Sequence, residues 1–261
     1  MSKASDIVVT NDFSCLIYGK QGTGKTIFGA GAVVRGDVLF VDADSGMLSV
    51  KQTRFLTDQQ KEHIWFETIR ETYYDKSSTQ RCKPTAYSRI SEIFAQLSKD
   101  GTWTDPDSKE VISPKTVVLD TLTSFAEYAL DDALWEAGAI ETLKITQPQW
   151  GSQLRKIGKI IQQGKAFPDI NFICLAHEQF KEDNLSGRTW CIPLVTGKFA
   201  FRVGSFFDEY YYADVKSAIS GEKYILMTRP TGLITARTRL DLPREMETSF
   251  KVVLDCIKDR K

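Results

Sequence analysis

The 261-residue sequence lacks the long apolar runs, the paired cysteines and the charge imbalance that mark several classes of protein. No stretch approaches the ~18 apolar residues of a membrane span, so we expect no membrane association. The cysteines form no C-x-x-C pair, which argues against a zinc site or a disulfide framework and favours a cytoplasmic location. Basic and acidic residues balance at 34 each, which argues against a protein that coats nucleic acid through bulk charge but leaves room for a local basic groove.

Short apolar runs and amphipathic stretches alternate along the chain. The apolar runs cover residues 13–18, 38–41, 116–119, 171–176 and 206–212, and helical spacing of apolar residues covers 87–97, 122–134 and 154–161. Continuous apolar strands alternating with amphipathic helices predict an α/β fold of three layers, with a mostly parallel central sheet covered on both faces.

The C-terminal part has a different pattern. Segments 224–228 and 233–240 flank Arg229-Pro230-Thr231-Gly232 and predict a β-hairpin, and 246–257 predicts a last amphipathic helix. Residues 100–114 read as an irregular surface excursion. With no repeat or linker in the sequence, we expect a single domain over 1–261, with a core at about 13–245 and the C-terminal helix at about 245–258.

Residues 19–26 match G-x-x-x-x-G-K-[ST], the phosphate-binding P-loop, between an apolar run and a helical one. The glycines let backbone N–H groups surround a phosphate, and the next helix adds its positive N-terminus. Lys25 would reach the β- and γ-phosphates and Thr26 would bind Mg²⁺, so we expect ATP and Mg²⁺ as cofactors. The expected nucleotide-binding residues are Gly19, Lys20, Gln21, Gly22, Thr23, Gly24, Lys25 and Thr26.

Acidic residues follow two of the apolar runs. Asp120 ends the run 116–119 in the Walker B pattern and is the second expected metal-binding residue. Thr121 follows it in place of the glutamate of AAA+ ATPases, so another carboxylate must orient the attacking water. Asp42 and Asp44 follow the run 38–41; either both reach the γ-phosphate site, or Asp42 caps the turn and only Asp44 is free. We favour Asp44 as the general base or water-positioning residue and Asp42 as its support.

Three further residues are expected to take part in catalysis. His177 ends the run 171–176, and because ligands of open α/β sheets lie beyond the carboxyl ends of strands, it is placed to sense the γ-phosphate. A purely structural histidine is the alternative. Arg237 and Arg239 are alternate residues of a predicted strand, so both guanidinium groups would share a face and grip a phosphate. The alternative is two solvated arginines on an edge strand.

These motifs, in this order, resemble the RecA-type recombinase core. In that family a strand ends in Asp-Ala-Glu, which Asp42-Ala43-Asp44 resembles, and Asp44 takes the position of the catalytic glutamate with a side chain one methylene shorter. The resemblance places His177 at the polar sensor, and Arg237 and Arg239 at a Lys-x-Lys pair that reaches the ATP of a neighbouring subunit. It implies a RecA-like sheet, ATP hydrolysis and self-association into a filament or ring. The chain looks most like short phage ATPases of the single-strand annealing or recombinase type.

The resemblance also implies two DNA-binding loops, at about 138–150 and 178–198. Basic and aromatic residues occur together there, as single-strand binding requires. The residues expected to contact DNA are Lys144, Trp150, Lys181, Arg188 and Lys198. Expected partners are single-stranded DNA and a phage single-strand-binding protein. Packing of Trp150 into the core is the alternative.

Two rival functions fit the same motifs. One is a replication-associated ATPase that loads or remodels another protein. The other is a nucleotide-switched binding module with little turnover, which the shortened Asp44 side chain suggests. The RecA core serves many functions, so the fold does not choose among them.

Overall fold

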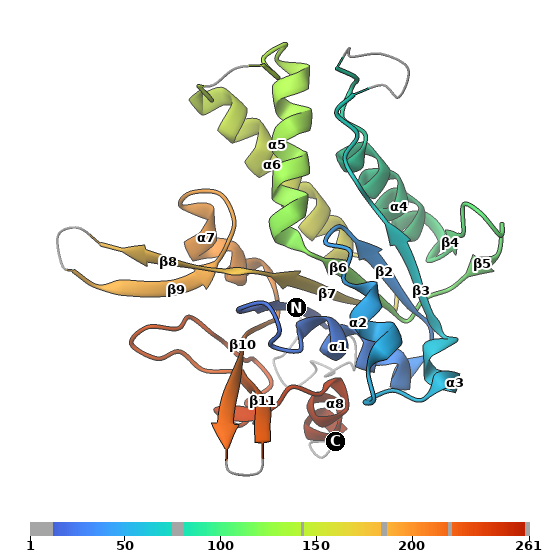
Figure 1. Cartoon of the computed structure of the whole chain (residues 1–261), viewed down its shortest axis with the longest axis vertical. Coiled ribbons are helices and arrows are strands. Elements are labelled where there is room, and N and C mark those ends of the chain that lie inside the picture. Colours follow the sequence, from blue (N-terminus) through green and yellow to red (C-terminus); the bar gives the residue numbers. More distant parts are fainter. Residues whose placement is uncertain (1–12, 75–80, 142–143, 184–186, 219–220, 259–261) are drawn as a thin grey trace, which may run out of the picture.

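Eight strands form one sheet at the centre of the structure, a computed structural model that describes residues 13–74, 81–141, 144–183, 187–218 and 221–258 (Figure 1). The strands of this sheet are β1 (Ser14–Tyr18), β2 (Val38–Asp42), β3 (Ile64–Thr68), β6 (Thr116–Asp120), β7 (Asn171–Ala176), β10 (Glu209–Ala218), β11 (Gly221–Met227) and β12 (Glu245–Glu247). Their order across the sheet is β12-β11-β10-β1-β7-β6-β2-β3.

The central strands are parallel, as the sequence predicts. β1 pairs in parallel with β7 and β10, and the parallel pairing continues through β6 and β2 to β3. Among the described strands of this sheet, only β11 and β12 run antiparallel to their neighbours. In this register Asp42 lies beside Asp120 and Tyr18 lies beside Ala176. The residues that follow these strands therefore meet at one edge of the sheet.

Helices cover both faces of the sheet. They are α1 (Lys25–Ala30), α2 (Met47–Gln52), α3 (Asp58–Lys61), α4 (Ala86–Asp100), α5 (Leu122–Glu136), α6 (Gln147–Lys165), α7 (Phe199–Arg202) and α8 (Phe250–Lys258), with 3₁₀ turns η2 (Gly31–Arg35) and η3 (Val203–Phe206). Leu16 and Tyr18 join a core with α4, α5, α6 and α7, whereas Cys15 and Ile17 join a second core with α1, α2 and α8. This confirms the three-layer α/β architecture. Within the described residues, none of these helices has the length and apolar character that a membrane crossing needs.

Two small ribbons lie outside the central sheet. β8 (Glu178–Glu182) pairs with β9 (Thr189–Pro193), so the segment expected to be a loop after His177 is largely a two-stranded ribbon. β4 (Trp103–Thr104) pairs with β5 (Val111–Ile112) inside the segment 100–114, which the sequence predicts to be irregular and superficial. That prediction is wrong at Trp103, because this side chain is completely buried in the core beside α4.

The C-terminal hairpin exists, but with different strands from those predicted. β10 and β11 form it, with Ala213 opposite Leu226, and β10 begins at Glu209 because η3 occupies the residues before it. Residues 233–240 make only isolated bridges. Side-chain hydrogen bonds hold this segment in place of a ladder: the Tyr18 hydroxyl donates to the Thr235 carbonyl (2.7 Å). The last helix begins at Phe250 and not near 246, because β12 pairs with β11 there.

Candidate functional site

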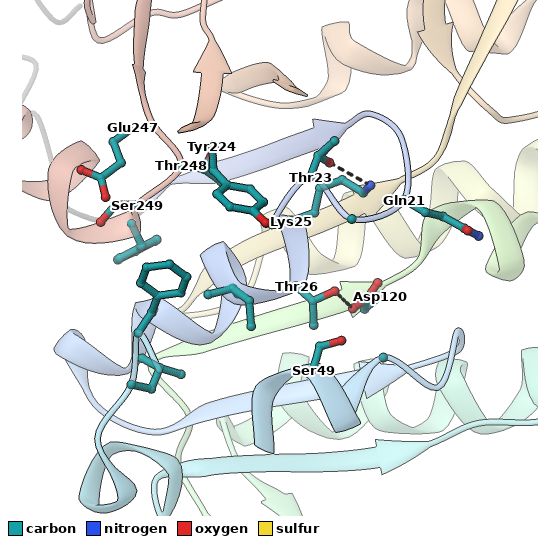
Figure 2. Close-up of a pocket in the computed structure, with 18 of the residues that line it drawn as sticks. Gln21, Thr23, Lys25, Thr26, Ser49, Asp120, Tyr224, Glu247, Thr248 and Ser249 are labelled. Atoms are coloured by element: carbon teal, nitrogen blue, oxygen red, sulfur yellow. Dashed lines mark hydrogen bonds between the residues drawn. The ribbon is translucent and has the colours of Figure 1, made fainter. Parts of the chain in front are cut away.

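A cleft of about 860 Å³ opens at the carboxyl edge of the sheet. The P-loop and the start of α1 form its floor, and the turns after β2, β6 and β7 contribute Asp44, Asp120 and His177. β11 and the turn between β12 and α8 form the other wall, beyond α1 in Figure 2. The volume lies within the range of ordinary small-molecule sites. The topology therefore gathers into one cavity the predicted residues from Gln21 to Thr26 together with Asp44, Asp120 and His177. Gly19, Lys20, Arg237 and Arg239 are not part of its lining.

Glycines shape the turn between β1 and α1. Gly22 and Gly24 have φ angles of +76° and +82°, in the left-handed region that side chains other than glycine rarely adopt. At Gly19 the reason is space, because a Cβ atom there would lie 2.2 Å from the Ala213 carbonyl oxygen on β10. The P-loop is thus held close against β10 of its own sheet at Gly19.

The Lys25 side chain bends back over this turn. Its Nζ donates hydrogen bonds to the carbonyl oxygens of Gly19 (2.9 Å) and Lys20 (2.6 Å) and to the Thr23 hydroxyl (3.4 Å; Figure 2). Burial lowers the pKa of Lys25 to about 8, although the nearby Asp120 carboxylate opposes this shift. An anion at the P-loop would restore the charge balance of this buried ammonium group.

Thr26 and Asp120 meet on the side of the cleft next to β2. The Thr26 hydroxyl donates to Asp120 Oδ2 at 2.8 Å. Burial is the main cause that raises the pKa of Asp120 to about 7, against the lowering effect of this hydrogen bond. Gly46 leaves the space beside the pair open, since a Cβ there would lie 3.2 Å from Asp120 Oδ2. A hydroxyl and a carboxylate with open space beside them fit Mg²⁺.

A metal ion at this position would need ligands from the nucleotide and from water. In the part of the chain that the structure describes, no group of three or more His, Cys, Asp or Glu side chains is arranged to hold a metal alone. Mg²⁺ binds through one or two protein ligands together with phosphate oxygens and waters in sites of this kind. The donor set therefore suits a metal that arrives with a phosphorylated ligand.

The two acids after β2 have different environments. Asp42 is buried and its Oδ1 accepts the backbone N–H groups of Gly46 (3.0 Å) and Asp44 (3.4 Å), so it caps the turn. Asp44 extends into the cleft with 40% of its side chain exposed, and its Oδ2 lies 3.1 Å from His177 Nε2. Of the two alternatives that the sequence leaves open, the structure shows the one in which Asp42 caps the turn and only Asp44 reaches into the cleft.

Helix α5 holds the pair of Asp44 and His177 in place. Tyr128 on α5 donates to the carbonyl oxygens of Ala43 (3.2 Å) and Ile69 (3.3 Å), which fixes the turn that carries Asp44. The His177 backbone N–H donates to the Thr123 hydroxyl at the start of α5 (3.0 Å). Both catalytic candidates therefore depend on α5 for their position.

Arg237 and Arg239 lie away from this cleft. Arg237 Nη2 donates to the carbonyl oxygens of Phe207 (2.6 Å) and Gly204 (3.1 Å), whereas Arg239 Nη1 contacts Asp208 Oδ1 (2.9 Å) with 56% of its side chain exposed. Asp208 precedes β10, so Arg239 lies at the amino edge of the sheet, opposite the P-loop. The expectation of a shared strand face is wrong, because residues 233–240 bend along β10 without forming a ladder.

The residues predicted to contact DNA occupy two separate surfaces. Lys144 is exposed before α6 and Trp150 is half-buried in its first turns, while residues 142–143 lie outside the described part of the chain. Lys181, Arg188 and Lys198 are exposed on or next to the ribbon of β8 and β9, where residues 184–186 also lie outside the described part. Figure 1 shows this ribbon projecting away from the central sheet.

Aromatic side chains accompany the basic residues of the ribbon. The Arg188 guanidinium lies 5.1 Å from the centroid of the Trp190 ring, and that ring packs edge-on against Phe201 on α7 at 5.8 Å. Phe180 and Phe201 are each about half exposed, at 54% and 51%. The ribbon thus combines cations with accessible aromatic surface.

The second wall of the cleft was not predicted from the sequence. Tyr224 on β11 and Glu247, Thr248 and Ser249 before α8 line it. Their segments lie far from the P-loop in sequence and match no motif. The one available signal was the position of residues 224–228 within a predicted strand late in the chain.

Comparison with known proteins gives one family and several similar structures. Residues 11–240 match the family model described as the AAA domain. The solved RadB recombinase is 17% identical over 85% of this chain and 84% of that chain, with a TM-score of 0.44. A KaiC-like protein from the archaeon Pyrococcus horikoshii is 13% identical over 84% of this chain and 79% of that chain, with a TM-score of 0.41.

A third solved structure is longer than this chain. It is an ATPase of the type III secretion system of pathogenic bacteria, 12% identical over 77% of this chain and 52% of that chain, with a TM-score of 0.44. The matched region thus spans about half the length of that ATPase. Among curated proteins, no sequence matches this chain.

Proposed function

Because the chain belongs to the AAA-domain family of P-loop ATPases, we propose that it binds ATP with Mg²⁺ in this cleft and hydrolyses it. The observation that carries the proposal is the meeting of three features in one cavity: the buried Lys25, the Thr26–Asp120 pair and the Asp44–His177 pair. Each feature supplies a different requirement of phosphoryl transfer, namely phosphate binding, metal binding and water positioning.

The P-loop binds the triphosphate. Lys25 Nζ exchanges its contacts with the Gly19 and Lys20 carbonyl oxygens for phosphate oxygens, and backbone N–H groups of the turn donate to the same phosphates. Thr26 and Asp120 hold Mg²⁺, which neutralises the charge of the triphosphate when bound. Holding the reactants in this fixed, partly buried geometry lowers the barrier through positioning and electrostatics.

Asp44 orients the attacking water and accepts its proton. The carboxylate lies in the cleft wall beside β2 with 40% of its side chain exposed, and the hydrogen bond from Tyr128 to the Ala43 carbonyl oxygen holds the turn that carries it. A γ-phosphate oxygen would compete with Asp44 for His177 Nε2, so the ring changes partner when ATP is present. This competition makes His177 a sensor of the terminal phosphate.

Steady-state ATP turnover of substituted proteins tests the proposal. Lys25→Ala should abolish both binding and turnover, whereas Asp44→Asn should retain binding and lose turnover by about 10²-fold or more. Asp107→Asn, on the exposed β4–β5 turn, removes a carboxylate outside the cleft and should behave as the wild type. Full turnover in Asp44→Asn would exclude Asp44 as the group that accepts the proton.

We further propose that the ATPase binds single-stranded DNA and acts in annealing or strand exchange as an oligomer. The support is the ribbon of β8 and β9, where Lys181, Arg188 and Lys198 lie close in sequence to the half-exposed rings of Phe180 and Phe201. Cations for phosphates and aromatic faces for bases are the two requirements of single-strand binding. The ribbon begins at Glu178, directly after His177, so strand binding and phosphate sensing would use adjoining residues.

Anisotropy of a labelled oligothymidylate at several salt concentrations tests this second step. A Lys181→Ala, Lys198→Ala double variant should bind more weakly and lower the salt slope by about 0.7 for each phosphate that it no longer neutralises. Lys99→Ala at the exposed end of α4 is the matched control. Turnover stimulated by a protein partner and not by DNA would favour a remodelling ATPase. Tight ATP binding with almost no turnover would favour a nucleotide switch.

A further inference from the structure

The cleft continues past the residues that the triphosphate needs. Lys25, Thr26 and Asp120 occupy the end next to the sheet, but the lining extends along α1 to Tyr224 on β11 and to Thr248 and Ser249 before α8. Figure 2 shows these C-terminal residues on the opposite side of α1 from the Thr26–Asp120 pair. The proposed phosphate binding and water positioning use none of these C-terminal residues.

Tyr224 is held directly against the P-loop. A Cβ atom at Gly24 would lie 3.3 Å from Tyr224 Cδ1, so the ring packs on the backbone of the phosphate-binding turn. The Tyr224 carbonyl oxygen accepts a hydrogen bond from the backbone N–H of Thr248 (3.1 Å). The Tyr224 hydroxyl donates to Glu222 Oε2 (3.2 Å). These contacts fix the ring at the point where the phosphate site meets the rest of the cleft.

The charges of the cleft give it a direction. The phosphate end carries Lys25 with the carboxylates of Asp44 and Asp120, whereas the C-terminal end carries the carboxylates of Glu222 and Glu247 with the ammonium group of Lys223. The P-loop and the proposed Mg²⁺ pair of Thr26 and Asp120 lie at the first end, so a nucleotide would place its phosphates there and its uncharged part at the C-terminal end.

Apolar and hydroxyl groups of the cleft lining suit an uncharged aromatic ring. Phe55 lines the cleft with 75% of its surface exposed, and the Tyr224 ring lines it beside the P-loop. The Thr248 hydroxyl is buried and has no hydrogen-bond partner among the described residues. Mostly apolar walls with a few hydroxyl groups are typical of small-molecule sites, and aromatic side chains stack on bases.

We propose that Tyr224 and the Glu247–Ser249 turn form the nucleobase subsite of the cleft, with the Tyr224 ring packed against a purine base. The inference rests on the proposed function, because the triphosphate at Lys25 fixes where the base must lie. It assigns the C-terminal strands and the start of α8 to ligand recognition. Tyr224 would thereby distinguish a nucleotide from a bare polyphosphate.

Calorimetric titrations with Mg-ATP and with Mg-tripolyphosphate separate the two ends of the site. The wild type should bind ATP more tightly than tripolyphosphate. Tyr224→Ala should weaken ATP binding about tenfold and change tripolyphosphate binding less than twofold, since stacking acts on the base alone. Tyr224→Phe keeps the ring and should keep the ATP affinity, even if Tyr224→Ala folds poorly. Tyr74→Ala, an exposed tyrosine outside the cleft lining, is the matched control.

Each outcome decides one of the two proposals. If Tyr224→Ala weakens ATP and tripolyphosphate equally, or weakens neither, Tyr224 does not contact the base and the subsite assignment fails. The assignment also fails if Tyr224→Phe loses as much ATP affinity as Tyr224→Ala. If the wild type binds neither ligand and Lys25→Ala changes nothing, it is the proposed ATP site that fails.

Discussion

Individual residues set the geometry of the site mainly by leaving room. Gly46 has an ordinary helical backbone (φ −80°), so the reason for glycine there is the space beside Asp120 and Thr26. Gly19 is glycine because the Ala213 carbonyl group approaches it closely. Small residues at such points keep a phosphate and a metal site open in a densely packed interior.

Gly46→Ala should therefore weaken metal binding with little change in stability. Its Cβ would lie 3.2 Å from Asp120 Oδ2 and 3.5 Å from Thr26 Oγ1, where Mg²⁺ and its waters would sit. We expect the Mg²⁺ concentration for half-maximal turnover to rise several-fold and thermal unfolding without ligand to match the wild type. Gly158→Ala on α6, where a Cβ meets nothing within 4 Å, is the control. An unchanged Mg²⁺ requirement would place the metal elsewhere.

Asp208 should stabilise the protein at neutral pH and lose this contribution in acid. Burial raises the pKa of this carboxyl, but hydrogen bonds from Ser14 and the cations Lys165 and Arg239 outweigh it, so the pKa lies below its usual range. A lowered pKa in the folded state adds stability above about pH 4, the unfolded value, and this stability is lost as the pH falls through the folded value.

The test is the free energy of unfolding in urea at several pH values. Asp208→Asn should be less stable than the wild type at pH 7, and the two proteins should converge as the pH falls below about 4, the unfolded value. If wild type and Asp208→Asn differ in free energy of unfolding by the same amount well above and well below this pH, the charge of Asp208 contributes nothing to stability. Asp58→Asn, a fully exposed carboxylate, should show no such difference.

At the scale of elements, α6 and β7 depend on one close contact. A Cβ at Gly164 would lie 2.5 Å from the Phe172 ring, which is buried between α6 and the sheet. Gly164→Ala should destabilise the fold by about 1–3 kcal/mol through overpacking. Gly158→Ala on the same helix meets no neighbour and should stabilise it by up to about 1 kcal/mol. Urea unfolding of both variants measures the difference, and equal effects would contradict this packing.

The buried elements were predictable and the exposed ones were not. The strands β1, β2, β6 and β7 are buried along their whole length, so their apolar runs were visible in the sequence. β3 lies at the edge of the sheet and is only partly buried, and β8 and β9 stand away from the core with many polar residues. Such strands gain little from burial, so a search for apolar runs passes over them.

The same limit applies to the site. Lys25, Thr26 and Asp120 follow from a local motif, and Asp44 and His177 follow from their places at strand ends. Tyr224 does not, since its contact with Gly24 joins two distant segments of the chain and depends on how β11 pairs with β10. Contacts between distant segments arise from the fold, and no local pattern in one sequence encodes them.

At the scale of the whole molecule, the carboxyl and amino ends of the parallel strands, which form opposite edges of the sheet, carry complementary features. The carboxyl edge holds the cleft, whose lining contains lysines but no arginine among the described residues. The amino edge presents Arg239, half exposed beside Asp208. Because a chain cannot bring opposite edges of its own sheet together, Arg239 can reach a nucleotide only in another copy. Arg237, bound to carbonyl groups of its own chain, is the weaker of the two predicted candidates.

Mixing two inactive variants tests this arrangement. Lys25→Ala lacks a working cleft but keeps Arg239, whereas Arg239→Ala keeps the cleft and should still bind ATP. If Arg239 acts in a neighbouring subunit, each variant alone should be inactive and their mixture should regain part of the wild-type turnover, because some interfaces unite an intact cleft with an intact arginine. Arg229→Ala, exposed and paired with Asp241, should stay active alone. Full activity of Arg239→Ala alone, or no recovery on mixing, would show that the cleft works without an arginine from another copy.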